Sequence, residues 1–190
     1  MLKGDFMIYD YDEIIKKYGN WYKLKKAIEK EEIFKIDNGL YSTTKSVKEI
    51  DIIVKKYNNP IFTFKSAYYY YGISDVIPDN YYIASSKNGT KYNDPSIKQF
   101  FMDNDILYLG VTSFEYLGTK INIYSKERLL IELIRYKHDI AYDYYKEVIN
   151  YYRKNVNEIN FQEVIDILKD FPKKDMILKI IQEEVLWWIT

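Results

Sequence analysis

The residues of this chain with the clearest possible chemistry are lysines. From Lys16 to Lys30 the sequence holds six lysines and one acidic residue, Glu29, although the whole chain carries a formal net charge of +0. Clustered ammonium groups neutralise phosphates and supply the sequence-independent part of nucleic-acid binding. The alternative interpretation is the ordinary solvated face of an amphipathic helix. The elements that carry these lysines decide between the two.

Two short helices are predicted around the lysines. Asp10 or Asp12 can cap the first helix, and Gly19 suits the position just past its end, where a left-handed backbone is needed. Asn20 can then cap the second helix. The apolar residues on one side of this second helix recur at the helical period and are expected to face the core: Trp21, Leu24, Ala27 and Ile28.

A hairpin is predicted directly after the second helix. Residues 33–36 alternate like a strand, Asn38-Gly39 is a turn signal, and residues 40–42 return. Helix, turn, lysine-bearing helix and hairpin is the order of a winged helix-turn-helix, which places one helix in a DNA major groove. The expected DNA contacts are Tyr22, Lys23, Lys26 and Lys30 on the helix and Lys35 on the wing.

These contacts account for affinity better than for sequence recognition. Lysines mostly contact phosphate, so the reading of base edges is thinly explained. Tyr22 can either contact a base edge or pack on a sugar. Each of these positions can also be a plain solvated one.

Composition limits the class of protein. A chain of 190 residues with a pI near 6.6 and 47% hydrophobic residues can form one large or two small domains. Its neutrality requires any nucleic-acid site to be local. The absence of cysteine excludes disulfides and cysteine-ligated zinc. No signal peptide or membrane span is evident, so a cytoplasmic protein without membrane contact is expected.

The rest of the chain predicts an α+β fold. We expect domains at 1–45, the winged unit, and at 46–190, a small sheet with flanking helices followed by a helical C-terminal group. Predicted strands are 81–85, 96–101, 114–117 and 120–124. Predicted helices are 47–57, 64–71, 126–137, 140–152, 161–171 and one beginning at 175.

No catalytic or metal-binding arrangement is evident. His138 is the only histidine and lacks the partner and nucleophile that base catalysis needs. Residues 87–90, KNGT, lack the spacing of a nucleotide-binding loop. Asp103 and Asp105 belong to a polar turn that is expected to be solvated rather than to hold a cation. We therefore expect that the protein is not an enzyme and that it binds neither a metal ion nor a cofactor.

Three segments together resemble a known family. Residues 63–78, TFKSAYYYYGISDVIP, look like the "T..SAL...GL.D.IP" stretch of AbiE-type abortive-infection antitoxins, the AbiEi family. Residues 125–135, SKERLLIELIR, resemble its "(T/S)..RTLLDLLR" helix, with Leu129 where Thr is common and Glu132 where Asp is common. Residues 38–41, NGLY, match its "rGvY" wing, with Asn38 in place of Arg.

The resemblance implies a bacterial antitoxin of a bicistronic anti-phage system. Family members bind inverted repeats in their own promoter through the winged domain and repress it. Their C-terminal domain neutralises a nucleotidyltransferase-like toxin, commonly described without a stable complex. A monomer in solution, or a weak dimer on DNA, is expected. The alternatives are a winged-helix protein-interaction module and a stand-alone transcriptional regulator without antitoxin activity.

A charged row and two aromatic runs complete the candidates. Arg128, Glu132 and Arg135 share one face of a predicted helix and form either an antitoxin surface, acting on toxin or its RNA substrate, or an exposed ion-pair row. The tyrosines of 68–71 surround their helix, so some are expected in the core and others at an interface, where stacking on RNA bases is an option. Trp187-Trp188 are expected to pack on the helical group or in a dimer contact.

Overall fold

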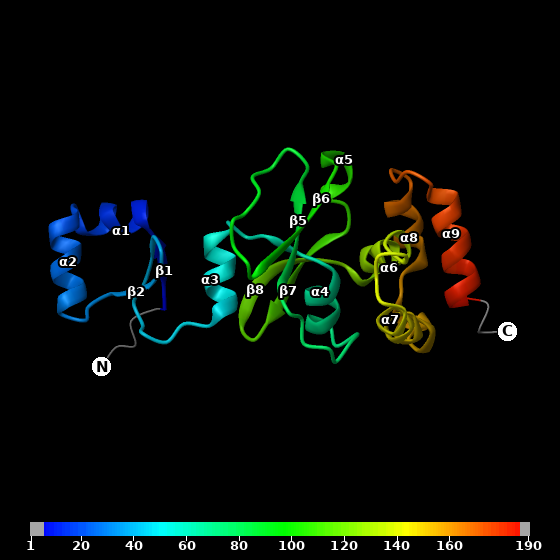
Figure 1. Ribbon diagram of the computed structural model, residues 1–190, viewed down its shortest axis with the longest axis horizontal. Helices are drawn as coiled ribbons and strands as arrows, with labels where there is room; N and C mark the ends of the chain where they lie inside the picture. The colour runs from blue at the N-terminus through cyan, green and yellow to red at the C-terminus, as the bar shows by residue number, and fades with distance from the viewer. Residues whose placement is uncertain (1–5, 187–190) are drawn as a thin grey trace. The chain divides into compact units, whose positions relative to one another are not determined.

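The computed structural model describes residues 6–186 and is mixed α+β, as the sequence predicts (Figure 1). The chain separates into two compact units, Met1–Pro60 and Ile61–Thr190, here called the N-terminal and the C-terminal unit. Trp187 and Trp188 lie outside the described residues, so their expected packing stays a prediction. Among residues 6–186, no helix is long and apolar enough to cross a membrane.

Within residues 6–60, the N-terminal unit combines three helices with a small antiparallel sheet. The strand order is β1-β3-β2, so the predicted hairpin, β2–β3, gains a third strand from the beginning of the chain. The elements are β1 (Ile8–Asp10), α1 (Tyr11–Tyr18), α2 (Trp21–Glu29), β2 (Phe34–Asp37), β3 (Leu40–Ser42) and α3 (Glu49–Lys56).

Local hydrogen bonds fix the ends of α1 and α2. Asp10, rather than Asp12, caps α1: its carboxylate accepts from the Glu13 amide at 2.9 Å, and the Glu13 carboxylate accepts from the Asp10 amide at 2.9 Å. Gly19 ends α1 with a φ of +85°. Asn20 caps α2 by accepting from the Lys23 amide at 3.0 Å. The predicted caps are therefore confirmed.

The core of the N-terminal unit confirms most of the predicted apolar face of α2. Leu24 and Ala27 are buried, and Ile28 packs on the core at partial burial. Trp21 was expected in this core, but it is 50% exposed. As the first residue of α2, it lies one turn before Leu24, beyond the buried stripe. The buried core residues are Ile14, Leu24, Ala27, Ile33 and Tyr41.

The boundary between the units falls after Pro60, not after residue 45 as expected. Helix α3 packs on β1 and so belongs to the N-terminal unit. The Lys55 ammonium also lies 2.6 Å from the Glu13 carboxylate, and the Lys56 ammonium lies 2.9 Å from that of Asp37. Sequence patterns place helices but not their long-range partners, which explains the difference.

The C-terminal unit contains a five-stranded mixed sheet in the order β6-β5-β4-β8-β7. The central strand, β4, was not predicted because it has only two residues. It pairs antiparallel with β5 and parallel with β8, while β5–β6 is parallel and β7–β8 is the predicted hairpin. The strands are β4 (Ile61–Phe62), β5 (Tyr81–Ser86), β6 (Ile97–Met102), β7 (Val111–Tyr116) and β8 (Thr119–Tyr124).

The predicted helical C-terminal group is present and centres on α6 (Figure 1). Helix α6 packs against β8, α4, α7, α8 and α9, so apolar and polar residues all around it are buried. A short helix, α5, replaces part of the turn expected at 103–105. The helices are α4 (Phe64–Tyr70), α5 (Asn104–Leu107), α6 (Lys126–Arg135), α7 (Tyr142–Lys154), α8 (Phe161–Leu168) and α9 (Lys174–Ile181).

Buried tyrosines make the C-terminal unit sensitive to alkali. Tyr68, Tyr124 and Tyr152 donate their hydroxyls to backbone carbonyls at 3.0, 2.7 and 2.9 Å. Burial raises the pKa of each phenol above the usual value of 10.0. Above pH 10 the unfolded chain therefore releases protons that the folded chain retains, and stability that is complete below pH 10 is lost as pH rises.

We expect each such tyrosine to lower the unfolding free energy by about 1.4 kcal/mol per pH unit above its unfolded pKa. Urea unfolding followed by circular dichroism at a series of pH values measures the slope. Tyr152→Phe should make that slope shallower by about 1.4 kcal/mol per pH unit, because one fewer proton is released on unfolding. An unchanged slope in Tyr152→Phe, or ionisation of these phenols near pH 10 in the folded protein, would contradict the expectation.

Candidate nucleic-acid interface

The outward face of α2 carries the predicted DNA contacts. The Tyr22 side chain is 64% exposed, and Lys23, Lys26 and Lys30 are also exposed. The Lys26 ammonium lies 4.6 Å from the centroid of the Tyr22 ring, a cation–π distance. Among the described residues these lysines form no salt bridge, and the first turn of α2 contains no acidic residue. Their charge is therefore available to a phosphate.

The β2–β3 hairpin presents Lys35 next to the start of α2. Lys35 is exposed and pairs in register with Tyr41, and the turn at Asn38-Gly39 uses a φ of +73° at Gly39. A hollow of about 520 Å³ is shared by the two elements. It is lined by Tyr11, Trp21, Lys35, Asn38, Gly39 and Tyr41. The structure thus brings the hairpin residue Lys35 and the N-terminal end of α2 together.

This surface includes Trp21, which helical periodicity alone assigned to the core, and a second aromatic residue, Tyr11. Tyr11 is 47% exposed and Trp21 is 50% exposed, and both line the hollow. Each is the first residue of its helix, directly after the capping residue. That position alone was no signal of exposure in the sequence, because Phe64 also begins its helix directly after the capping residue and is 4% exposed. Tyr11 and Trp21 add flat apolar area beside the lysines, which suits contact with a sugar or a base.

The charged row of α6 is not a surface. Arg128 and Glu132 are each 0% exposed, which corrects both interpretations drawn from their spacing. Only Arg135 reaches solvent, with 21% of its side chain exposed. The predicted spacing onto one helix face is right, but this face is covered by other helices of the C-terminal unit. Arg128 and Glu132 therefore cannot touch a toxin in this conformation.

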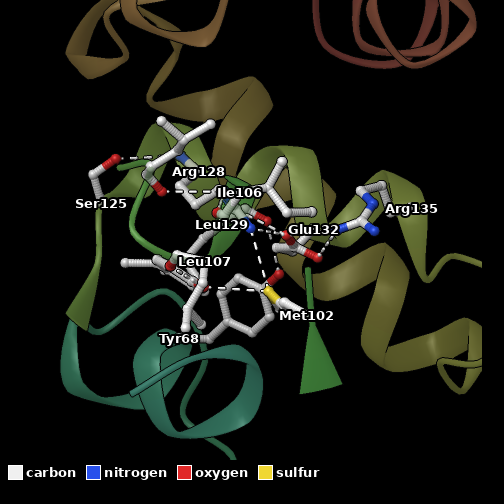
Figure 2. A network of polar contacts seen from close by, with 11 residues as sticks. Tyr68, Met102, Ile106, Leu107, Ser125, Arg128, Leu129, Glu132 and Arg135 are labelled. Carbon is white, nitrogen blue, oxygen red and sulfur yellow. Dashed lines mark hydrogen bonds and ion pairs between the residues drawn. The ribbon is translucent and has the colours of Figure 1, made fainter. Parts of the chain in front are cut away.

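The Arg128 guanidinium is instead fully bonded inside the protein (Figure 2). Its Nε and one terminal nitrogen donate to the Glu132 carboxylate at 2.9 and 2.8 Å. The other terminal nitrogen donates to the carbonyls of Ile106 and Leu109 at 2.8 and 3.1 Å. Arg135 donates to the same carboxylate at 2.9 Å. A buried charge survives only when paired and bonded in this way.

The remaining candidate residues, His138 and Asp103, are ordinary exposed residues. His138 is exposed in the turn after α6, and Asp103 is paired with Lys87 at 2.7 Å. Within residues 6–186, no cluster of three or more histidine, aspartate or glutamate side chains is arranged to hold a metal ion.

Two comparisons with known proteins find no relative of this chain. No protein-family model matches the chain, and a search of curated proteins finds no significant match. The class of protein that the fold defines is a two-unit α+β protein with a basic helix in its N-terminal unit. The family resemblance of the three sequence segments stays a prediction.

Proposed function

We propose that the protein represses its own operon by binding promoter DNA and acts as the antitoxin of an AbiE-type toxin–antitoxin system. In this proposal the N-terminal unit is a winged helix-turn-helix, with α2 as recognition helix and β2–β3 as wing. The single observation that supports it best is the row of exposed lysines on α2, which is free of salt bridges within the described residues, with Lys35 sharing a hollow with the first residue of the same helix.

The proposal predicts the effect of removing the row. Each lysine that contacts a phosphate is worth about 1 kcal/mol, so Lys23→Ala, Lys26→Ala and Lys30→Ala together should weaken binding roughly 100-fold. The slope of the logarithm of the binding constant against the logarithm of the salt concentration should also become shallower, because binding releases about three fewer counterions. A gel shift on the DNA immediately upstream of the gene, with scrambled competitor and a salt series, measures both quantities.

The matched control removes the same charge elsewhere. Lys91, Lys120 and Lys154 are exposed on the C-terminal unit, and their triple alanine variant should bind like the parent protein. Specific binding that survives loss of the α2 lysines with an unchanged salt slope would overturn the recognition-helix assignment. Equal losses in the two triple variants would indicate attraction by general charge only.

The antitoxin half of the proposal rests on the resemblance of residues 63–78 and 125–135. The two segments meet in the structure, because the Tyr68 hydroxyl of the first donates to the Leu129 carbonyl of the second at 3.0 Å. They therefore belong to one folded core. Co-expression with the neighbouring nucleotidyltransferase-like toxin should restore growth, and the α2 triple variant should still rescue while losing repression.

One observation favours the protein-interaction alternative. Tyr11, Trp21 and Tyr22 place exposed aromatic area around the lysines, and such area also suits a protein partner. Salt separates the two functions, because DNA binding weakens steeply with salt and apolar contact does not. Promoter binding without toxin rescue would instead identify a stand-alone regulator.

A further inference from the structure

The C-terminal unit contains a cavity that the proposed function does not use. Its volume is about 780 Å³, within the size range of small-molecule sites. The walls come from α4, from β5 and β6, and from the end of α6 through the start of α7. Aromatic residues are the largest group in the lining, contributed by Phe64, Tyr68, Tyr82, Phe100, Tyr136 and Tyr144.

Two ammonium groups converge on one ring of this cavity. Lys65 and Lys98 lie 5.6 and 5.3 Å from the centroid of the Tyr82 ring. Lys65 is only loosely held by Asp79, at 3.7 Å, and Lys98 forms no salt bridge with the described residues. Two cations beside an aromatic wall attract an anionic group attached to a flat ring.

A different wall carries carboxylates. Asp139 lies in the segment between α6 and α7, and Asp143 and Glu147 lie on α7. All three are exposed and form no salt bridge with the described residues. An ionised carboxylate only accepts hydrogen bonds, so this wall favours a ligand that offers N–H donors.

Tyr144 adds a donor to the lining. Its hydroxyl is buried and forms no hydrogen bond of acceptable geometry within residues 6–186, although Ser74 is close enough to influence it. Burial raises the pKa of Tyr144 to about 12, so the phenol is protonated at neutral pH. A ligand that accepts this hydrogen bond would relieve the cost of a buried unsatisfied polar group.

We propose that this cavity binds a free mononucleotide whose base carries an exocyclic amine, with guanine the best match. The base stacks on the aromatic walls, its N–H groups donate to the carboxylates, and the phosphate contacts Lys65 and Lys98. A simple anion would leave the aromatic walls and the carboxylates unused, and a simple cation would leave Lys65 and Lys98 without a partner. The inference uses only the C-terminal unit and does not rest on DNA binding or antitoxicity.

Calorimetric titration of the full chain with GMP, UMP, guanosine and inorganic phosphate tests the proposal. GMP should bind at least about tenfold more tightly than guanosine, which lacks the phosphate contact, and than UMP, which lacks the amine. Inorganic phosphate alone should not bind measurably. Equal affinities for GMP, UMP and guanosine, or no binding of GMP at millimolar concentration, would overturn the proposal.

Variants at the lysines give an independent readout. Lys98 is exposed on β6, so Lys98→Ala should fold, weaken GMP binding about tenfold and leave guanosine binding unchanged. Lys91→Ala removes an exposed charge outside the cavity lining and should change neither affinity. Unchanged GMP binding by Lys98→Ala would contradict the assigned phosphate position. A short oligoribonucleotide that binds where GMP does not would reassign the cavity to an RNA strand and overturn the free-nucleotide proposal.

Discussion

Arg128→Ala is expected to destabilise the C-terminal unit by about 3–5 kcal/mol, the usual cost of breaking a buried ion pair from one side. This is a large part of the total stability of a typical domain, about 5–15 kcal/mol. The substitution removes both donors to Glu132 from this side chain and leaves the Ile106 and Leu109 carbonyls without this partner. It also opens a void between the rings of Tyr124 and Phe171, which lie 4.5 and 4.4 Å from the guanidinium carbon.

A double-mutant cycle separates the ion pair from the packing. Arg128→Met fills most of the volume without charge, and Glu132→Leu removes the carboxylate. Each single variant leaves a buried group that has lost this ion pair, with Glu132 held only by Arg135 in Arg128→Met, so the double variant should be more stable than the sum of the single losses implies. Urea unfolding followed by circular dichroism measures all three. Simple additivity of the two losses would show that Arg128 and Glu132 are not coupled.

Arg135→Ala is the matched control within the same network. Its guanidinium is partly exposed, and Arg128 still holds the Glu132 carboxylate when Arg135 is removed. We expect a loss near 1 kcal/mol, typical of a single partly solvated charged contact. A loss as large as that of Arg128→Ala would place the essential pair at Arg135 instead.

This network shows where prediction from the sequence ends. The i,i+4 spacing of Arg128 and Glu132 correctly places both on one side of α6, because helical periodicity is a local property. Burial of that side depends on α8 and α9, which lie far along the chain. A periodic pattern assigns one face to the core and the other to water, and it fails for a helix covered on every side.

The same difference between local and long-range interactions explains which other parts of the fold were predictable from the sequence. Caps such as Asp10 and Asn20 and the Asn38-Gly39 turn were predictable because each is decided within a few residues. Strands β1 and β4 were not, since segments this short are ordered by distant partners rather than by their own pattern. The aromatic cavity was also out of reach, because its lining runs from residue 64 to residue 147.

Gly110→Ala is expected to destabilise the C-terminal unit by about 3 kcal/mol, from backbone strain of about 1 kcal/mol and overpacking of 1–3 kcal/mol. Gly110 has a φ of +71°, and an added Cβ would lie 2.7 Å from the Arg128 Cβ and 2.9 Å from the Ile167 Cδ1. The Ile167 methyl can rotate away, but the Arg128 Cβ is fixed to the backbone of α6. Relief of this close contact must therefore shift either the loop that contains Gly110 or helix α6.

Either movement disturbs the start of α6. The Gly110 carbonyl accepts from the amide of Ser125, the cap of α6, at 2.7 Å, and its neighbour Leu109 accepts from Arg128. Gly72→Ala is the matched control, with a φ of +66° and nothing within 4 Å of the added Cβ. It should cost only the strain of about 1 kcal/mol. Equal losses in the two variants by urea unfolding would show that close approach to Arg128 adds nothing. A larger loss at Gly110 would show that the glycine is needed so that the loop can pass against the buried arginine.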